Sequence, residues 1–403
     1  MKKPALRFKR FDGEWGDCEL GKIITSFSGG TPTAGCAEYY NGSIPFIRSG
    51  EINCSETELF ITPKGLDNSS AKLVEKGDIL YALYGATSGE VGRSKINGAI
   101  NQAILAIRPV KGFDSNFMAF WLRKSKKSII DTYLQGGQGN LSGEIVKKLV
   151  YSYPLNNAEQ KAIGSFFSEL DALIEGKRVK LDKLKKLKLA YLGKMFPKKG
   201  SRVPEVRFKG FSGDWDERKL SDYLTICPLV NSDNQYKAKD VLSVSGEFGV
   251  VNQIEFQGRS FAGASLLKYR VSETGTVIYT KSPLKANPYG IIKANKGPTG
   301  IVSVLYAVYV PNDNADADFV QVYFDDLYRL NSYLRTLVNK GAKNTLLISD
   351  EEALNGYVVF PSRPEQRKIA AFFNHLDNLI NLQQQELDKL SNIKSACLSK
   401  MFA

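Results

Sequence analysis

The strongest hydrophobic pattern along the chain is a stripe spaced by three and four residues, and it occurs twice. A stripe with this spacing is typical of the seam of a coiled coil. The positions that we expect to pair the helices are Phe167, Leu170, Ile174, Leu181, Leu184, Phe373, Leu376, Ile380, Leu387 and Leu390. Lys177 and Gln383 interrupt the two stripes, and polar seam residues weaken such a pair but can fix its register. The pattern therefore predicts two long helices.

The two stripes belong to an internal duplication. Residues 159–196 align without gaps on residues 365–402, and 19 of these 38 positions are identical. Residues 4–15 (PALRFKRFDGEW) also recur as residues 204–215 (PEVRFKGFSGDW). Each half is thus a variable block followed by a shared segment. The domains that we expect are a first block at 1–155, a first spacer helix at 156–200, a second block at 201–358 and a second spacer helix at 359–403.

The helix pattern alone leaves open how the stripes are covered. A coiled coil between two copies of the chain would bury them. Pairing within one chain would do so too, and it has the higher effective concentration because both stripes are in the same polypeptide. We therefore expect two antiparallel helices that pack together with pseudo-twofold symmetry and hold the two blocks apart.

Both blocks show short β-like runs separated by loops rich in Gly, Ser and Asn. In the first block we expect strands at 44–47, 79–84 and 103–107 and a helix at 117–133. In the second block we expect strands at 277–279, 290–292 and 301–310 and a helix at 319–338. The predicted fold class is α+β, with two mixed α/β domains joined by two long antiparallel coiled-coil helices.

Charge indicates a polyanionic partner. The chain of 403 residues has 55 Lys and Arg against 42 Asp and Glu, a formal charge of +13. A protein with such an excess of positive charge most often binds nucleic acid. Residues 91–127 hold eight basic residues and one acid, and residues 259–296 hold seven and one. A single charge run is usually a solvated face, but two runs at comparable places in two blocks favour contact with phosphates.

The residues that catalysis needs are scarce. His375 is the only histidine, which excludes a multi-histidine metal site, and the five cysteines form no C-x-x-C pair. Asn287-Pro288-Tyr289-Gly290 is similar to the N-P-P-[FY] motif of amino-methyltransferases but lacks its second proline. The sequence contains no apolar run of about 18 residues, so we do not expect it to span a membrane. We therefore expect a binding protein with no catalytic residues, no bound metal and no cofactor of its own.

Residues in or beside Gly-rich loops are the candidates for DNA contact, because the backbone can approach DNA there and because Arg, Lys, Asn and Gln are the usual readers of base edges. Two of the candidates have an equally weighted structural alternative, which is core packing for Tyr84 and a turn position for Asn140. In the first block we favour Arg48, Tyr84, Thr87, Ser88, Lys95, Asn101, Gln102, Gln138 and Asn140. In the second block we favour Lys281, Lys285, Asn287, Tyr289, Lys293, Lys340, Lys343 and Asn344.

The chain as a whole resembles the specificity subunits of type I restriction–modification systems. The motif Pro154…Glu159-Gln160…Ile163…Leu170-Asp171 and its copy Pro361…Glu365-Gln366…Ile369…Leu376-Asp377 carry the resemblance. Gly29-Gly30-Thr31-Pro32, Ile44-Pro45-Phe46-Ile47 and Gly77-Asp78-Ile79-Leu80 are also typical of this family's first recognition domain. The second block departs from the family pattern because it has no clear counterpart of the Gly-Gly-Thr-Pro run.

The resemblance implies a non-catalytic, cytoplasmic subunit of a bacterium or archaeon. Its two target-recognition domains would read the halves of a bipartite site on double-stranded DNA, and the unlike blocks make that site asymmetric. The helices would set the gap and dock two methyltransferase subunits on the outer faces of 159–196 and 365–402. Those subunits would methylate adenine with S-adenosylmethionine, and restriction subunits would add ATP- and Mg-dependent cleavage. The alternatives are a decoy that binds methyltransferase subunits without reading DNA, and a standalone enzyme.

Overall fold

The computed structural model describes residues 3–134, 140–261, 263, 265–284, 287–340 and 346–402. It divides into two units, of which unit 1 consists of Met1–Arg178 and Gln385–Ala403 and unit 2 of Val179–Gln384. Each unit thus combines one block with parts of both long helices. The fold is α+β with two sheet-containing domains, as the sequence predicts.

Unit 1 is built on two four-stranded sheets and a helical layer. The first sheet has the order β2 (Ile24–Ser28), β9 (Ile104–Pro109), β6 (Ile79–Ala82), β7 (Val91–Arg93), with all neighbours antiparallel. The second has the order β4 (Leu59–Ile61), β3 (Tyr40–Ile47), β8 (Gly98–Ile100), β5 (Lys72–Val74). The other elements are β1 (Trp15–Glu19), which pairs with β10 (Val150–Pro154), and the helices α1 (Pro63–Asp67), α2 (Ser115–Tyr133) and α3 (Gly143–Lys147).

Unit 2 repeats the first of these sheets. Its order is β12 (Leu224–Ile226), β19 (Tyr306–Pro311), β16 (Val277–Thr280), β17 (Ile292–Ala294), again antiparallel throughout. The other strand pairs are β11 (Asp216–Lys219) with β22 (Tyr357–Phe360), β13 (Leu242–Ser245) with β14 (Gly249–Asn252), β15 (Arg270–Ser272) with β18 (Gly300–Val302), and β20 (Asn339–Lys340) with β21 (Leu346–Leu347). The helices are α5 (Gln253–Gln257), α6 (Ala317–Asp325) and α7 (Leu327–Arg335). The duplication therefore extends through the blocks, where sequence similarity has faded.

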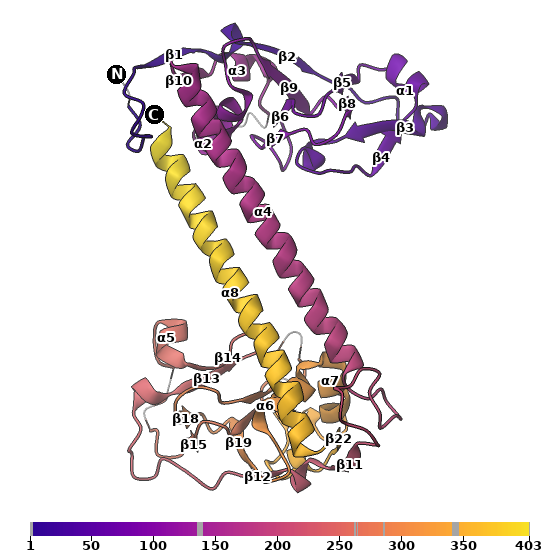
Figure 1. Cartoon of the computed structure of the whole chain (residues 1–403), viewed down its shortest axis with the longest axis vertical. Coiled ribbons are helices and arrows are strands. Elements are labelled where there is room, and N and C mark those ends of the chain that lie inside the picture. Colours follow the sequence, from indigo (N-terminus) through magenta and orange to yellow (C-terminus); the bar gives the residue numbers. More distant parts are fainter. Residues whose placement is uncertain are drawn as a thin grey trace. The chain divides into compact units, whose positions relative to one another are not determined.

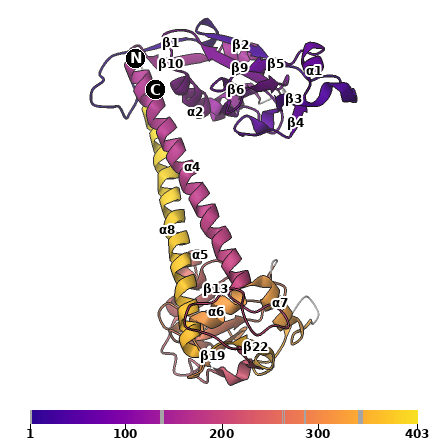
Figure 2. The ribbon, with the colours of Figure 1, turned by 45° about the vertical axis from the view of Figure 1, so that its right-hand side comes forward.

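Two long helices carry the predicted stripes, α4 (Asn157–Lys194) and α8 (Arg363–Met401), and each is continuous (Figure 1). In unit 1 they run antiparallel, because Phe167 packs on Phe402 and the carboxylate of Asp171 lies 2.5 Å from Nζ of Lys394. Both views show the last turns of α8 beside the first turns of α4 (Figure 1, Figure 2). In unit 2 the helices are again antiparallel, and Nζ of Lys188 lies 2.7 Å from Asp377.

The seam residues are enclosed by the helix pair and by the blocks. Seven of the ten are buried, namely Phe167, Leu170, Ile174, Leu181, Phe373, Leu376 and Leu387, and Leu184, Ile380 and Leu390 are half-buried. Gln383, which interrupts the stripe in the sequence, is buried as well. His375 is exposed on α8.

The motifs that recur along the chain meet at the start of each long helix. Arg7 makes a two-point ion pair with the buried Glu159 of α4, and Arg207 makes the same pair with Glu365 of α8. The amide of Gln160 accepts the Asp114 N–H and donates to the Pro154 carbonyl, and Gln366 does the same with Asp316 and Pro361. The repeated residues therefore form one structural joint that is present in both units.

Three of the predicted elements differ in the structure. The expected strand 301–310 is two strands, β18 and β19, because residues 303–306 turn with the Tyr306 N–H bonded to the Ser303 carbonyl. The expected helix 319–338 is α6 and α7, because Asp326 leaves helical geometry and its side chain caps α7 by accepting the Arg329 N–H. The expected strand 290–292 begins at Ile292, because Gly290 has a φ of +91°, which places it in a turn. Within the described residues no helix has the length and apolar character of a membrane span.

Candidate nucleic-acid interface

In unit 1 the loop between β6 and β7 lies against the segment that follows α2. The N–H of Leu141 donates to the carbonyl of Leu83 at 2.9 Å, and Tyr84 and Asn140 form an isolated antiparallel bridge. Two predicted DNA contacts that are 56 residues apart in the sequence are thus neighbours. We call residues 83–90 with 140–141 the first loop edge.

The loop is held in shape by its own hydrogen bonds. The hydroxyl of Ser88 donates to the Gly85 carbonyl at 3.0 Å, and the Glu90 N–H donates to the Thr87 carbonyl at 2.9 Å. Ser88 is buried, so its hydroxyl serves the turn. Tyr84 packs partly on the core of unit 1, whereas Thr87 is half-buried and Asn140 is exposed. Of these four candidates, Ser88 is the least accessible to a ligand.

The other candidates of the first block lie on strand ends and turns. Lys95 and Gln102 are exposed, and Asn101 uses its side-chain oxygen to accept the Ala103 N–H. The hydroxyl of Thr31, in the Gly-Gly-Thr-Pro run, donates to Oε1 of Gln102 at 2.6 Å. Thr31 is not among the residues that the sequence predicts for DNA contact. This hydrogen bond orients the Gln102 amide through its oxygen and does not use the two N–H donors of the amide.

Arg48 is bound by carboxylates of its own block. Its guanidinium lies 3.0 Å from Glu51 and 2.5 Å from Glu58. Burial alone would raise the pKa of Glu51, but the hydrogen bonds from Arg48 and from two backbone N–H groups lower it to about 2. Arg48 therefore stabilises a turn, and a phosphate would have to compete with two acids for it.

The corresponding edge of unit 2 is formed by the loop between β16 and β17 and by Asp350, which follows the β20–β21 pair. Nζ of Lys281 lies 2.7 Å from Asp350, three residues beyond β21, and Asp350 also accepts from Arg270 at 2.6 Å. We call residues 281–284 and 287–291, with Asp350, the second loop edge. Both units thus place a hairpin loop of the first sheet beside a later segment.

The remaining candidates of unit 2 are less exposed than the sequence suggests. Lys293 is buried and pairs with Asp325 at 2.5 Å. Tyr289 is half-buried, and its carbonyl accepts the hydroxyl of Tyr279 at 2.7 Å. Asn287 is buried, and its side-chain oxygen has no hydrogen-bond partner among the described residues.

The last candidate of the second block that the structure describes is Lys340, which lies in β20. Gln138, Lys285, Lys343 and Asn344 lie outside the described residues.

The basic run 91–127 is partly neutralised within unit 1. Arg108 pairs with Asp78, Arg123 with Asp171 and Lys126 with Glu90. Three other members, Lys95, Lys111 and Lys127, are exposed. The run is therefore not one continuous cationic surface. Lys95 and Lys111 are exposed members that follow β7 and β9 of the first sheet.

Exposed aromatic side chains are a feature of unit 2 that the sequence search did not weigh. Phe248 and Phe256 contact each other at 5.5 Å between ring centroids, and the Arg259 guanidinium lies over the ring of Phe261 at 4.5 Å. All three rings are exposed. The turn sequence Gly246-Glu247-Phe248-Gly249, which places an aromatic residue at a hairpin tip, is the signal that could have indicated Phe248.

The chain is similar to known proteins over nearly its whole length. Residues 12–186 match the family model of the type I restriction modification DNA specificity domain. The chain is 24% identical to the MjaIX specificity subunit of a type I restriction enzyme from Methanocaldococcus jannaschii, over 97% of this chain and 96% of that protein. It is 20% identical to the MjaVIII specificity subunit of the same organism, over 97% and 92%.

The fold is similar as well. The crystal structure of the type I restriction–modification S subunit from M. genitalium superposes with a TM-score of 0.67 at 16% identity, and the match covers 100% of this chain and 99% of that one. Sequence and fold agree with the resemblance carried by the duplicated motifs. Residues 12–186 thus match the DNA specificity domain of type I restriction–modification systems, and the chain is similar in sequence and in fold, over nearly its whole length, to specificity subunits of these systems.

Proposed function

We propose that this chain reads an asymmetric, bipartite site on double-stranded DNA and directs adenine methylation and restriction by partner subunits. A specificity subunit is the non-catalytic DNA-recognition part of a type I enzyme. The observation that carries the finer proposal is the loop edge, which both units build on a sheet of the same strand order. Two equivalent edges in one chain suit two half-sites.

The two edges present different chemistry. The first offers Tyr84, Thr87 and Asn140, and the second offers Lys281 and Tyr289. Amide side chains read base edges, whereas lysines bind mainly phosphates. Because the side chains differ, we expect the two half-sites to differ in sequence. The loop residues predicted above remain the proposed DNA contacts, with Gln102 and Asn140 for bases and Lys95 and Lys281 for phosphates.

The outer faces of the long helices are the proposed docking sites for methyltransferase subunits. Apolar side chains are exposed there at repeated positions, Leu173 with its counterpart Leu379 and Leu187 with its counterpart Ile393. Exposed apolar side chains on a helix favour a protein partner. Since each unit carries the same pair of positions, we propose two methyltransferase subunits per chain. S-adenosylmethionine would be bound by these partners, and ATP and Mg by restriction subunits, all in the cytoplasm.

The test is co-expression of the chain with its cognate methyltransferase subunit, followed by mapping of methylated adenines across the host genome. We expect one gapped, asymmetric motif with a methylated adenine in each half. The methyltransferase subunit expressed alone is the control and should not methylate that motif. A complex that forms but adds no methylation would contradict DNA reading and favour the decoy. Methylation or cleavage by the purified chain alone would favour a standalone enzyme.

A further inference from the structure

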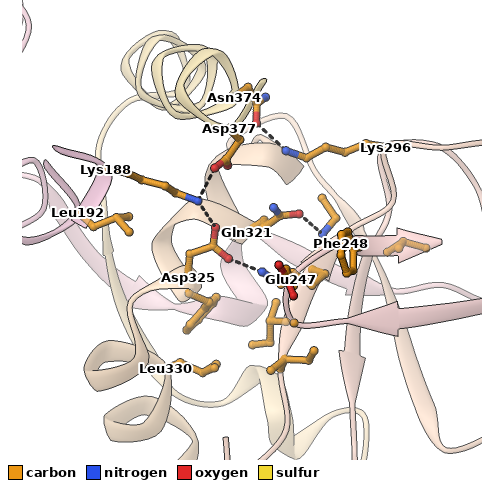
Figure 3. Close-up of a pocket in the computed structure, with 18 of the residues that line it drawn as sticks. Lys188, Leu192, Glu247, Phe248, Lys296, Gln321, Asp325, Leu330, Asn374 and Asp377 are labelled. Carbon is orange, nitrogen blue, oxygen red and sulfur yellow. Dashed lines mark hydrogen bonds and ion pairs between the residues drawn. The ribbon is translucent and has the colours of Figure 1, made fainter. Parts of the chain in front are cut away.

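Unit 2 contains a cleft of about 600 Å³ between the β13–β14 hairpin, β17, α6 and the parts of α4 and α8 that belong to this unit (Figure 3). This volume is in the range of sites that hold small molecules and cofactors. The cleft also reaches Asn287 of the second loop edge. It therefore lies directly behind the loop that is proposed to contact DNA.

One side of the cleft holds an unused hydrogen-bond acceptor. Asn287 is only 9% exposed, and its buried side-chain oxygen has no hydrogen-bond partner among the described residues. A buried acceptor without a partner is unfavourable, because it has lost its hydrogen bonds to water. An N–H donor on a ligand in the cleft would satisfy it. The base edges of nucleotides carry such donors.

An exposed aromatic ring lines the same cleft. Phe248 lies in the β13–β14 turn, where the hydroxyl of Ser245 accepts the backbone N–H groups of Glu247 and Phe248. Its ring is 58% exposed and borders the cleft (Figure 3). Exposed aromatic rings stack on nucleobases, because every base has a flat π-face. The turn therefore presents a stacking surface to the cleft.

The charges of the cleft leave a place for one anionic group. Asp325 is held by Lys293 and Lys188, and Lys188 also pairs with Asp377 (Figure 3). These carboxylates are therefore neutralised. Glu247 beside Phe248 would repel a phosphate. Lys296 already binds Asn374 and Asp318, whereas Lys185 is exposed on the α4 side of the cleft. A phosphate group would thus bind on the α4 side, with the attached base in contact with Phe248 and Asn287.

We propose that this cleft binds a single nucleotide, with the base stacked on Phe248 and an N–H of the base donating to Asn287. The nucleotide can be an extrahelical residue of the bound DNA or a free mononucleotide. The first source rests on the proposed function, because it requires the second loop edge to contact DNA. The second source does not. The two sources are separated by different measurements on the full chain.

The first measurement titrates the purified chain with dAMP by calorimetry. We expect saturable binding, and binding at least tenfold weaker for deoxyribose 5-phosphate, which has the phosphate but no base. Asn287→Leu and Phe248→Ala should each weaken dAMP binding at least tenfold. Phe261→Ala removes an equally exposed ring outside the cleft and should not change it. Asn287→Leu should not lower the melting temperature, because it removes an unpaired buried acceptor, whereas a merely structural Asn287 would lower it.

The second measurement compares two duplexes that differ only by one unpaired adenosine bulge. If the ligand comes from DNA, the chain should bind the bulged duplex at least tenfold more tightly than the plain duplex, and Phe248→Ala should abolish this preference. Binding of dAMP without duplex binding would contradict the proposed function and retain the cleft site. Duplex binding with neither bulge preference nor dAMP binding would overturn the cleft site and retain the proposed function.

Discussion

Nη2 of Arg7 lies 2.6 Å from Oε2 of Glu159, a carboxylate on α4 whose side chain is only 1% exposed. The hydrogen bond to Glu159 raises the pKa of Arg7. Arg207 and Glu365 repeat this pair in unit 2, where Glu365 is also 1% exposed. The Arg-Phe-Lys and Glu-Gln motifs of the duplication therefore attach the start of each block to the start of the following long helix.

Removing Arg7 should strongly destabilise unit 1. Arg7→Ala leaves the buried carboxylate of Glu159 without its partner, which costs roughly 3–5 kcal/mol when a buried ion pair is broken. Urea unfolding followed by tryptophan fluorescence measures this loss, and Arg207→Ala should cost unit 2 a similar amount. The double variant Arg7→Ala/Glu159→Leu should recover part of the stability. A loss below about 1 kcal/mol would show that the pair is as weak as a surface ion pair.

The long helices and the duplication could be predicted because their signals are local. The stripe at Phe167, Leu170 and Ile174 is visible within two turns of helix, and these three residues are buried. The break between α6 and α7 was missed, because Asp326 lies inside an apolar run and only its backbone geometry reveals the cap. The repeated strand order could not be read either, because the blocks share a backbone plan but few side chains.

The DNA contacts could be predicted only as loops rich in polar residues. The carboxylate that binds Lys281 is Asp350, 69 residues away in the sequence, and the one that binds Lys293 is Asp325, 32 residues away. Tertiary pairing over such distances decides which lysines of a basic run are neutralised. It cannot be derived from a charge count. The roles of the individual loop residues therefore remain predictions.

Removing Lys281 and Lys285 together should weaken DNA binding equally for all sequences. Phosphate contacts release counterions, so the logarithm of the binding constant falls linearly with the logarithm of the salt concentration. Each lost contact reduces the steepness of this line by about one, so the double variant should reduce it by about two. Asp350 keeps Arg270 as a partner, which should preserve the fold. A salt titration of duplex binding measures the slope, with Lys186→Ala on the exposed face of α4 as the control. Unchanged binding and slope would exclude both lysines from the interface.

Gln102 should instead affect sequence preference. An amide side chain that contacts a base contributes about 1–3 kcal/mol of discrimination, so Gln102→Ala should relax specificity at one base position of the site. Thr31→Val removes the hydroxyl that orients the amide and should relax the same position to a smaller extent. Sequencing of methylated sites in cells that express each variant measures the preference. Relaxation at several positions, or none, would argue against base reading by Gln102.

Gly29 should be required for the packing of the first block. A Cβ at this position would lie 1.8 Å from the carbonyl oxygen of Ile100, so Gly29→Ala would force strand β8 to move. Overpacking of this kind costs about 1–3 kcal/mol. Gly50→Ala is the matched control, because a Cβ there meets nothing within 4 Å. Thermal unfolding should show a lower melting temperature for Gly29→Ala alone, and equal values for the two variants would contradict a steric role for the Gly-Gly-Thr-Pro run.

The exposed apolar residues of the long helices should determine how many methyltransferase subunits bind. In unit 1 Leu173 and Ile393 lie near the Asp171–Lys394 ion pair, and in unit 2 Leu379 and Leu187 lie near its counterpart, Asp377–Lys188. A charged side chain at these positions would have to be buried without a partner in the complex, which is costly.

We therefore expect Leu173→Glu/Ile393→Glu to lower the number of bound methyltransferase subunits from two to one, and the same change at Leu379 and Leu187 to do likewise. Light scattering of the purified complexes measures this number. Val150→Glu, at a residue that is 61% exposed on β10 and is not part of either long helix, is the control and should keep two. If all four substitutions together leave two subunits bound, the partners dock on another surface. If either pair alone releases both subunits, docking on one unit depends on the other.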